Sequence, residues 1–123
     1  MTERDKSYVE NMLMFALRVQ SRINSVDLAT FLHDEEKQDL VLYPLGQLGE
    51  NANKVSEEFR DKNNNILWNP VIGVRNRIFH SYGDISMEVI FEIATNNIPT
   101  LISQLQEILN HSEEICCGDE GGA

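Results

Sequence analysis

Apolar residues recur at intervals of three and four along most of this chain, and that spacing constrains its fold more than any other feature. Between residues 41 and 59 the steps are four, three, four, three and four, and a similar stripe runs from residue 8 to residue 23. This period matches one face of an α-helix. No stretch of five or more residues alternates cleanly between apolar and polar, as a half-buried strand would. The pattern predicts an all-α, up-and-down helical bundle of four main helices plus one short helix.

Capping residues and prolines divide this pattern into helices. Ser25, Asp34 and Ser86 each precede an apolar periodic segment and are expected N-caps, and Asn69-Pro70 is a typical helix start. The expected helices span 5–23, 26–33, 35–59, 70–80 and 86–110. Pro44 should either kink its helix or mark the true first turn of that helix, and Pro99 should bend the last helix.

The acidic residues are concentrated in the C-terminal third. The 123 residues carry a net charge of −10, from 20 acids and 10 bases. Twelve acids and all ten bases precede residue 78, whereas eight acids and no base follow Arg77. A strongly acidic surface repels polyanions, which excludes a general DNA-binding protein or a polybasic membrane protein. The charge distribution leaves room for a small cationic site that includes Arg75 and Arg77.

Length and composition favour one domain in a reducing compartment. We expect a helical domain over residues 1–110 and an acidic, Gly-rich flexible tail over 111–123. No apolar run approaches the length of a transmembrane helix, and the first residues do not resemble a signal peptide. Cys116 and Cys117 are adjacent and cannot join distant parts of a fold. A cytoplasmic protein with no membrane partner is therefore expected.

The motifs of metal and phosphate sites are missing from this sequence. No Glu-x-x-His occurs before His33, His80 or His111, so a di-metal bundle site is not expected. Cys-x-x-Cys and Gly-rich phosphate loops do not occur either. We therefore expect neither a metal nor a cofactor.

One segment is dense in groups that bind phosphate or transfer protons. Residues 75–82, RNRIFHSY, contain two guanidinium groups, a carboxamide, an imidazole and a phenol. Arg binds phosphate through paired N–H groups and stays charged, and His titrates near neutral pH. These groups suffice for RNA cleavage without a metal. His80 would activate the ribose 2′-OH, and Arg75 would hold the phosphate and offset its developing charge.

The spacing of these two residues adds a geometric condition. Five residues correspond to about 140° around a helix, so Arg75 and His80 do not share one face of a straight helix. Either the helix ends near His80 or the site is assembled between two copies of the chain. A symmetric dimer would bring two copies of each residue into one cleft.

The segment resembles the Arg-x4-His-x-Tyr motif of HepT-like toxins, which belong to the HEPN (higher eukaryotes and prokaryotes nucleotide-binding) superfamily. The resemblance covers residues 4–109 and includes features outside the motif. These are Arg4-Asp5, the segment Gly49-Glu50-Asn51-Ala52, Trp68, and Ile98-Pro99-Thr100-Leu101.

The resemblance implies a homodimeric, metal-independent endoribonuclease toxin whose partner is a minimal nucleotidyltransferase antitoxin, MntA. It assigns catalysis to Arg75 and His80 and a supporting role to Asn76. Arg77 is a further candidate for substrate binding, although an arginine at such a position can also be a solvated surface charge. It also implies that Tyr82 is the residue to which the antitoxin transfers AMP. A nucleotide attached beside Arg75 would compete with the phosphate of the RNA substrate.

A second hypothesis comes from a different functional class. The chain could be a non-catalytic subunit that binds a nucleotide or substrate for a minimal nucleotidyltransferase, with Arg75 as a phosphate anchor. The net charge of −10 favours this alternative because free RNA would be attracted only weakly. Cleavage of RNA by the isolated chain separates the two hypotheses.

Overall fold

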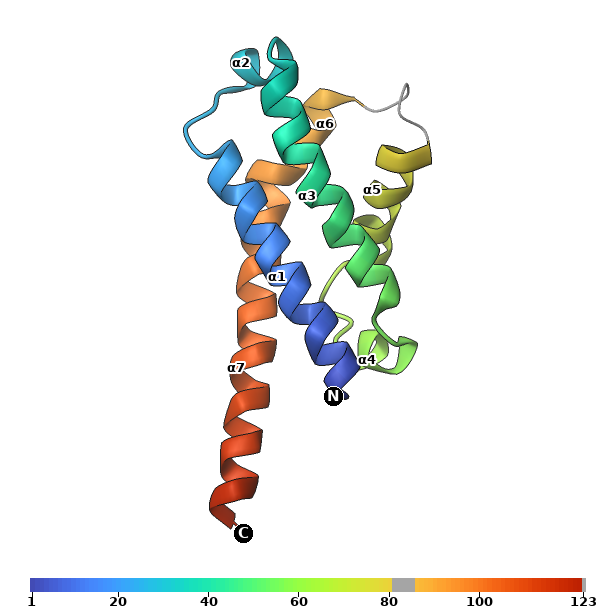
Figure 1. The fold of residues 1–123 in the computed structure, drawn as a ribbon, viewed down its shortest axis with the longest axis vertical. Coiled ribbons are helices and arrows are strands. Elements are labelled where there is room, and N and C mark those ends of the chain that lie inside the picture. The colour runs from blue at the N-terminus through green and yellow to red at the C-terminus, as the bar shows by residue number, and fades with distance from the viewer. Residues whose placement is uncertain (81–85, 123) are drawn as a thin grey trace.

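The computed structural model describes residues 1–80 and 86–122, and the side chains of residues 1–78 and 86–111. All regular structure in these residues is helical, which confirms the predicted all-α class. Figure 1 shows the elements in chain order: α1 (Glu3–Ile23), α2 (Leu28–Leu32), α3 (Glu35–Lys54), α4 (Glu57–Lys62), α5 (Trp68–His80), α6 (Met87–Glu92), the π-helical segment η2 (Ile93–Asn97) and α7 (Ile98–Gly122).

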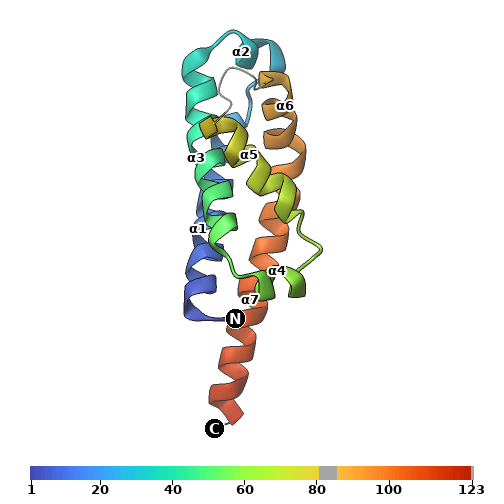
Figure 2. The same ribbon diagram turned by 90° about the vertical axis from the view of Figure 1, so that its right-hand side faces the viewer.

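The long helices form an up-and-down bundle. Helices α1 and α3 lie side by side and antiparallel, α7 packs along α1, and α5 packs on α3 (Figures 1 and 2). The last predicted helix consists of α6, η2 and α7 in direct succession. Helix α7 continues past residue 110 without a break and does not mark a boundary there. The division into a 1–110 domain and a 111–123 tail stays a prediction.

The predicted apolar stripes form the core of the bundle. Every stripe residue between positions 41 and 59 is buried, as are Met12, Val19 and Ile23 of α1, whereas Tyr8 and Phe15 are partly buried. The buried set extends along α7 to Leu105. Burial of these side chains is the main favourable contribution to folding, and the spacing of three and four residues is what directs them to one side of each helix.

Three predicted helix boundaries were wrong. The short helix begins after Asp27, whose carboxylate accepts the N–H of Thr30 at 2.7 Å, and the predicted cap Ser25 instead has a left-handed backbone with φ of 67°. The segment predicted as 35–59 is two helices, since α3 ends at Lys54. Helix α5 begins at Trp68, two residues before Pro70.

A buried carboxylate accounts for the break between α3 and α4. Asp5 of α1 accepts hydrogen bonds from the Ser56 backbone N–H at 2.9 Å and from the Ser56 hydroxyl at 2.6 Å. The Ser56 oxygen in turn accepts the N–H of Phe59 at 3.2 Å and so caps α4. Asp5 therefore fixes the start of α4 to the first turn of α1. Burial acts to raise the pKa of Asp5, but hydrogen bonds from Ser56 and Thr2 outweigh it and lower the pKa below its ordinary value.

We expect Asp5→Asn to lower the free energy of unfolding by about 1.5–3 kcal/mol at pH 7, as is typical for hydrogen bonds to a charged group. A carboxyl whose pKa is lower in the folded than in the unfolded state stabilises the fold above about pH 4, and this stabilisation is lost as the pH falls through the folded-state pKa. The difference between wild type and variant should therefore shrink on acidification. Urea unfolding at pH 7, 5 and 3 measures it, and a difference that grows at low pH would contradict the assignment.

Pro44 lies within α3 rather than in its first turn. Proline has no N–H, so the carbonyl four residues earlier loses its usual helical partner. That carbonyl belongs to Leu40, and it accepts a hydrogen bond from the Arg22 guanidinium of α1 at 2.8 Å. A contact from the neighbouring helix thus replaces the bond that Pro44 cannot make.

Candidate active site

Helix α5 carries most of the predicted site. Arg75, Asn76 and Arg77 lie in its second half, and His80 is its last residue. His80 is thus the last residue of α5 before the segment 81–85, which lies outside the described residues, and both arrangements that the spacing of Arg75 and His80 allows stay open. Tyr82 lies outside the described residues.

Gly49 allows α5 to approach α3 closely at the level of Arg75. A Cβ atom added at Gly49 would lie 2.5 Å from the Arg75 Cβ and 2.9 Å from the Val71 carbonyl oxygen, both too short for real contacts. A side chain at position 49 would therefore force the two helices apart. The glycine thus sets the distance between α3 and the helix that bears the motif.

Two polar contacts fix the side chain of Arg75. Its Nε donates to the Glu50 carboxylate of α3, and its Nη1 donates to the Asn76 side-chain oxygen at 2.8 Å. The side chains of Arg75 and Glu50 are 24% and 28% exposed, so the pair lies at the edge of the bundle, where a ligand can reach it. A guanidinium has five N–H donors, and these contacts use two of them. The two contacts hold the Arg75 guanidinium in one orientation.

Glu50 is the site residue that sequence reasoning did not identify. It belongs to the Gly49–Ala52 segment of the family resemblance, but the sequence assigned it no role. Its second contact, with Lys54 at 4.0 Å, is an ordinary exposed pair one helical turn away. One signal in the sequence could have identified this residue: Glu50 directly follows Gly49, the glycine at the contact between α3 and α5.

The structure does not place Arg77 beside Arg75. Two residues correspond to about 200° around a helix, so these side chains leave α5 on nearly opposite sides. Arg75 is partly buried against α3, whereas Arg77 is exposed. A contribution of Arg77 to the same phosphate would therefore come from a different direction.

Other site types find no support in the described part of the chain. Residues 1–78 and 86–111 contain no group of three or more His, Cys, Asp or Glu side chains arranged to hold a metal ion. None of the helices described is both long enough and apolar enough to cross a membrane.

Comparison with known proteins decides the family. The family model for HepT-like ribonucleases (Ribonuclease HepT-like) matches residues 12–108, which include the α3–α5 contact and the whole motif. The chain belongs to the HepT-like ribonuclease family. The predicted family and enzyme class, a ribonuclease, are thereby confirmed.

Individual relatives agree with this assignment. A protein of Caldanaerobacter subterraneus named as an RNase is 26% identical over 104 residues, which cover 85% of this chain and 93% of the relative. One from Methanocaldococcus jannaschii, also named as an RNase, is 29% identical over 90 residues, 73% of this chain and 74% of the relative. A protein of Thermococcus cleftensis named as a ribonuclease HepT is 20% identical over 108 residues, 88% of this chain and 98% of the relative. No solved structure gives a significant match.

Proposed function

We propose that this HepT-like protein is a metal-independent endoribonuclease toxin in which Arg75 and His80 cleave RNA. The observation that carries the proposal is the position of Arg75: Glu50 and Asn76 orient its guanidinium at the accessible edge of the α3–α5 pair, five residues before His80 on the same helix. An oriented guanidinium is suited to bidentate contact with a phosphodiester.

RNA brings its own nucleophile to this reaction. His80 removes the proton from the ribose 2′-OH, and the 2′-oxygen attacks the adjacent phosphorus. The bond from phosphorus to the 5′-oxygen of the next nucleotide breaks, and that oxygen takes up a proton. The products are a 2′,3′-cyclic phosphate and a free 5′-OH. Arg75 binds the phosphate oxygens and offsets the charge that accumulates on them in the transition state.

We propose that two copies of the chain form the complete site. In a symmetric dimer with α5 at the interface, His80 of the second copy could protonate the leaving 5′-oxygen. Small-angle scattering at micromolar concentration should give the mass of a dimer, and a monomer that still cleaves RNA would contradict a shared site.

Regulation by a minimal nucleotidyltransferase of the MntA type completes the proposed system. The Tyr82 hydroxyl would attack the α-phosphorus of ATP held by that partner, releasing pyrophosphate and leaving AMP in a phosphodiester bond to the tyrosine. Tyr82 follows His80 by two residues, so the bound nucleotide would bring its negative charge close to the catalytic segment. There it would compete with the substrate phosphate for Arg75.

Tyr82→Phe should make the toxin insensitive to its antitoxin. Phenylalanine keeps the ring but has no hydroxyl to accept AMP, so growth should stop even when the nucleotidyltransferase is co-expressed. Intact mass spectrometry should show AMP adducts on the wild type and none on the variant. His80→Ala is the matched control, since it should be harmless yet still gain AMP. Adducts that persist in Tyr82→Phe would place the modification elsewhere.

A further inference from the structure

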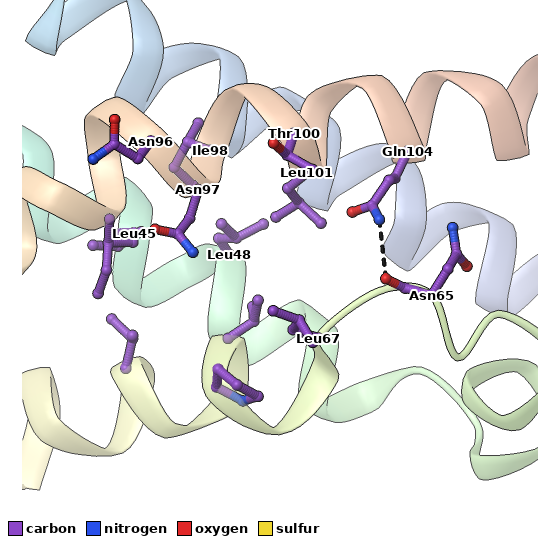
Figure 3. Close-up of a pocket in the computed structure, with 14 residues that line it drawn as sticks. Leu45, Leu48, Asn65, Leu67, Asn96, Asn97, Ile98, Thr100, Leu101 and Gln104 are labelled. Atoms are coloured by element: carbon purple, nitrogen blue, oxygen red, sulfur yellow. Dashed lines mark hydrogen bonds between the residues drawn. The ribbon is translucent and has the colours of Figure 1, made fainter.

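A cavity of about 380 Å³ lies between α3, α5 and the start of α7, and the proposed cleavage mechanism does not use it (Figure 3). Helix α5 packs mainly on α3, and the cavity occupies the space between its other flank and the η2–α7 segment. The volume is within the range of about 300–1,000 Å³ that is common for small-molecule sites.

The floor of this cavity is apolar and uncharged. Leu45 and Leu48 of α3, Val71 and Val74 of α5, and Leu101 of α7 supply most of it. None of the described residues that line the cavity carries a formal charge, although the protein as a whole has a net charge of −10. Such a surface favours a ligand group that is itself uncharged and has apolar faces.

Carboxamide side chains supply the polar groups of the cavity. Asn97 extends from η2 toward Leu45 and Leu48, as Figure 3 shows, and Asn96 precedes it on the same segment. At the other end, the Gln104 amide donates to the Asn65 backbone oxygen at 3.0 Å and links α7 to the loop before α5. A carboxamide offers both donors and an acceptor, so Asn96 and Asn97 can pair with either kind of group.

The segment η2 departs from α-helical geometry where this side of the cavity meets α7. The N–H of Ile98 donates to the Ile93 carbonyl, five residues back, instead of four. Pro99 follows and cannot donate at all, so the chain has a local reason to depart from α-helical geometry here. Turns of this kind occur frequently at functional sites. Here the turn contains Asn96 and Asn97, both of which line the cavity.

We propose that this cavity binds one unstacked nucleobase of the RNA substrate, an inference that rests on the proposed ribonuclease function. A nucleobase is planar and uncharged, with apolar faces and an edge of donors and acceptors that Asn and Gln side chains can pair with. The position fits, because Val74 lies directly before Arg75 in α5. Arg77 follows Val74 by three residues and so neighbours it on the helix surface, where its charge can bind the phosphate of the inserted nucleotide.

Titration of the full-length protein with the four uncharged nucleosides tests this proposal by NMR of the Leu, Val and Ile methyl groups. Nucleosides lack phosphate, so neither Arg75 nor Arg77 can account for their binding. At least one nucleoside should shift the methyl signals of Leu45, Leu48, Val71, Val74 and Leu101 more than those of the rest of the core.

Asn97→Leu should weaken that binding by about 3–10-fold, the equivalent of one lost hydrogen bond. Asn53→Leu, at an exposed carboxamide of α3 that does not line the cavity, is the matched control.

Three outcomes would overturn the proposal: no nucleoside perturbs these methyl groups, Asn97→Leu and Asn53→Leu bind equally well, or indole, which lacks a nucleobase edge, binds as tightly as the nucleosides. The last result would indicate a docking site for an apolar protein side chain. The result of this test can also be distinguished from the result of an RNA cleavage assay. A protein that binds nucleosides but never cuts RNA contradicts the cleavage mechanism alone, and one that cuts RNA without binding nucleosides contradicts the cavity alone.

Discussion

Replacing Arg75 with alanine should lower the rate of RNA cleavage by about 10²–10³-fold while leaving the protein folded, a loss typical of removing one preorganised group that stabilises a transition state. Arg75 is partly exposed at the edge of the bundle, and its polar contacts are with Glu50 and Asn76 rather than with the buried core. Removing this side chain should therefore disturb the packing of the bundle only slightly. Single-turnover cleavage of a short RNA, together with circular dichroism and thermal unfolding, measures both effects.

Three further variants define what Arg75 contributes. Arg75→Lys keeps the charge but not the planar fork, so it should recover only part of the rate. Arg77→Ala should have a smaller effect than Arg75→Ala, because Arg77 leaves α5 on nearly the opposite side. Arg18→Ala, on the exposed face of α1 beside Phe15, removes the same charge and should cleave at the wild-type rate. If Arg75→Ala and Arg18→Ala lose the same fraction of the cleavage rate, Arg75 contributes only through the net charge of the protein.

Gly49→Ala should damage both stability and activity. The new methyl group would lie 2.5 Å from the Arg75 Cβ, so α5 must move away from α3. Overpacking of this kind costs about 1–3 kcal/mol of unfolding free energy. The same movement separates Arg75 from Glu50 and should lower cleavage at least tenfold even at temperatures where the variant is fully folded. Urea unfolding and single-turnover cleavage at 15 °C separate the two effects.

Gly73→Ala is a matched control within α5 itself. Among the described residues, no atom beyond the adjoining residues and the local helix backbone lies within 4 Å of a Cβ added at Gly73, and the residue is in the interior of the helix. Alanine should therefore stabilise the protein by about 0.5–1 kcal/mol, since it has the higher helix propensity, and should leave cleavage unchanged. A Gly49→Ala variant as stable and active as Gly73→Ala would show that the helices tolerate a wider separation.

The main helices and the core followed from the spacing of apolar residues, because this spacing alone decides which side of a helix is buried. One error occurred where a tertiary contact overrides local preference. The stripe from residue 41 to residue 59 is continuous in sequence, yet α3 ends at Lys54 because Asp5 binds Ser56 from another helix. Such a contact spans about fifty positions, and no local pattern reveals it.

The candidate site also has features that the sequence predicts and features that only the structure reveals. The motif at residues 75–82 is contiguous, so its residue types and the helix that carries residues 75–80 could be predicted. The ion pair of Arg75 with Glu50 joins two helices and depends on the close approach at Gly49, so it appears only in the folded structure. The nearly opposite directions of Arg75 and Arg77 follow from helical spacing alone, but the structure was needed to show that Arg75, and not Arg77, is the one partly buried against α3. The small cationic site expected from the charge distribution stays a prediction, and the structure adds that Arg75 is paired with the carboxylate of Glu50.

Cleavage of RNA by the purified protein in excess EDTA, compared between wild type and His80→Ala, tests the central claim most directly. The account predicts that the wild type cuts RNA without metal and leaves 2′,3′-cyclic phosphate and 5′-OH ends. His80→Ala should be slower by about 10²–10⁴-fold, the usual contribution of a general base. Wild-type protein that binds RNA but leaves it intact would contradict the account and support the non-catalytic alternative, and a His80→Ala variant as active as wild type would contradict the assigned chemistry.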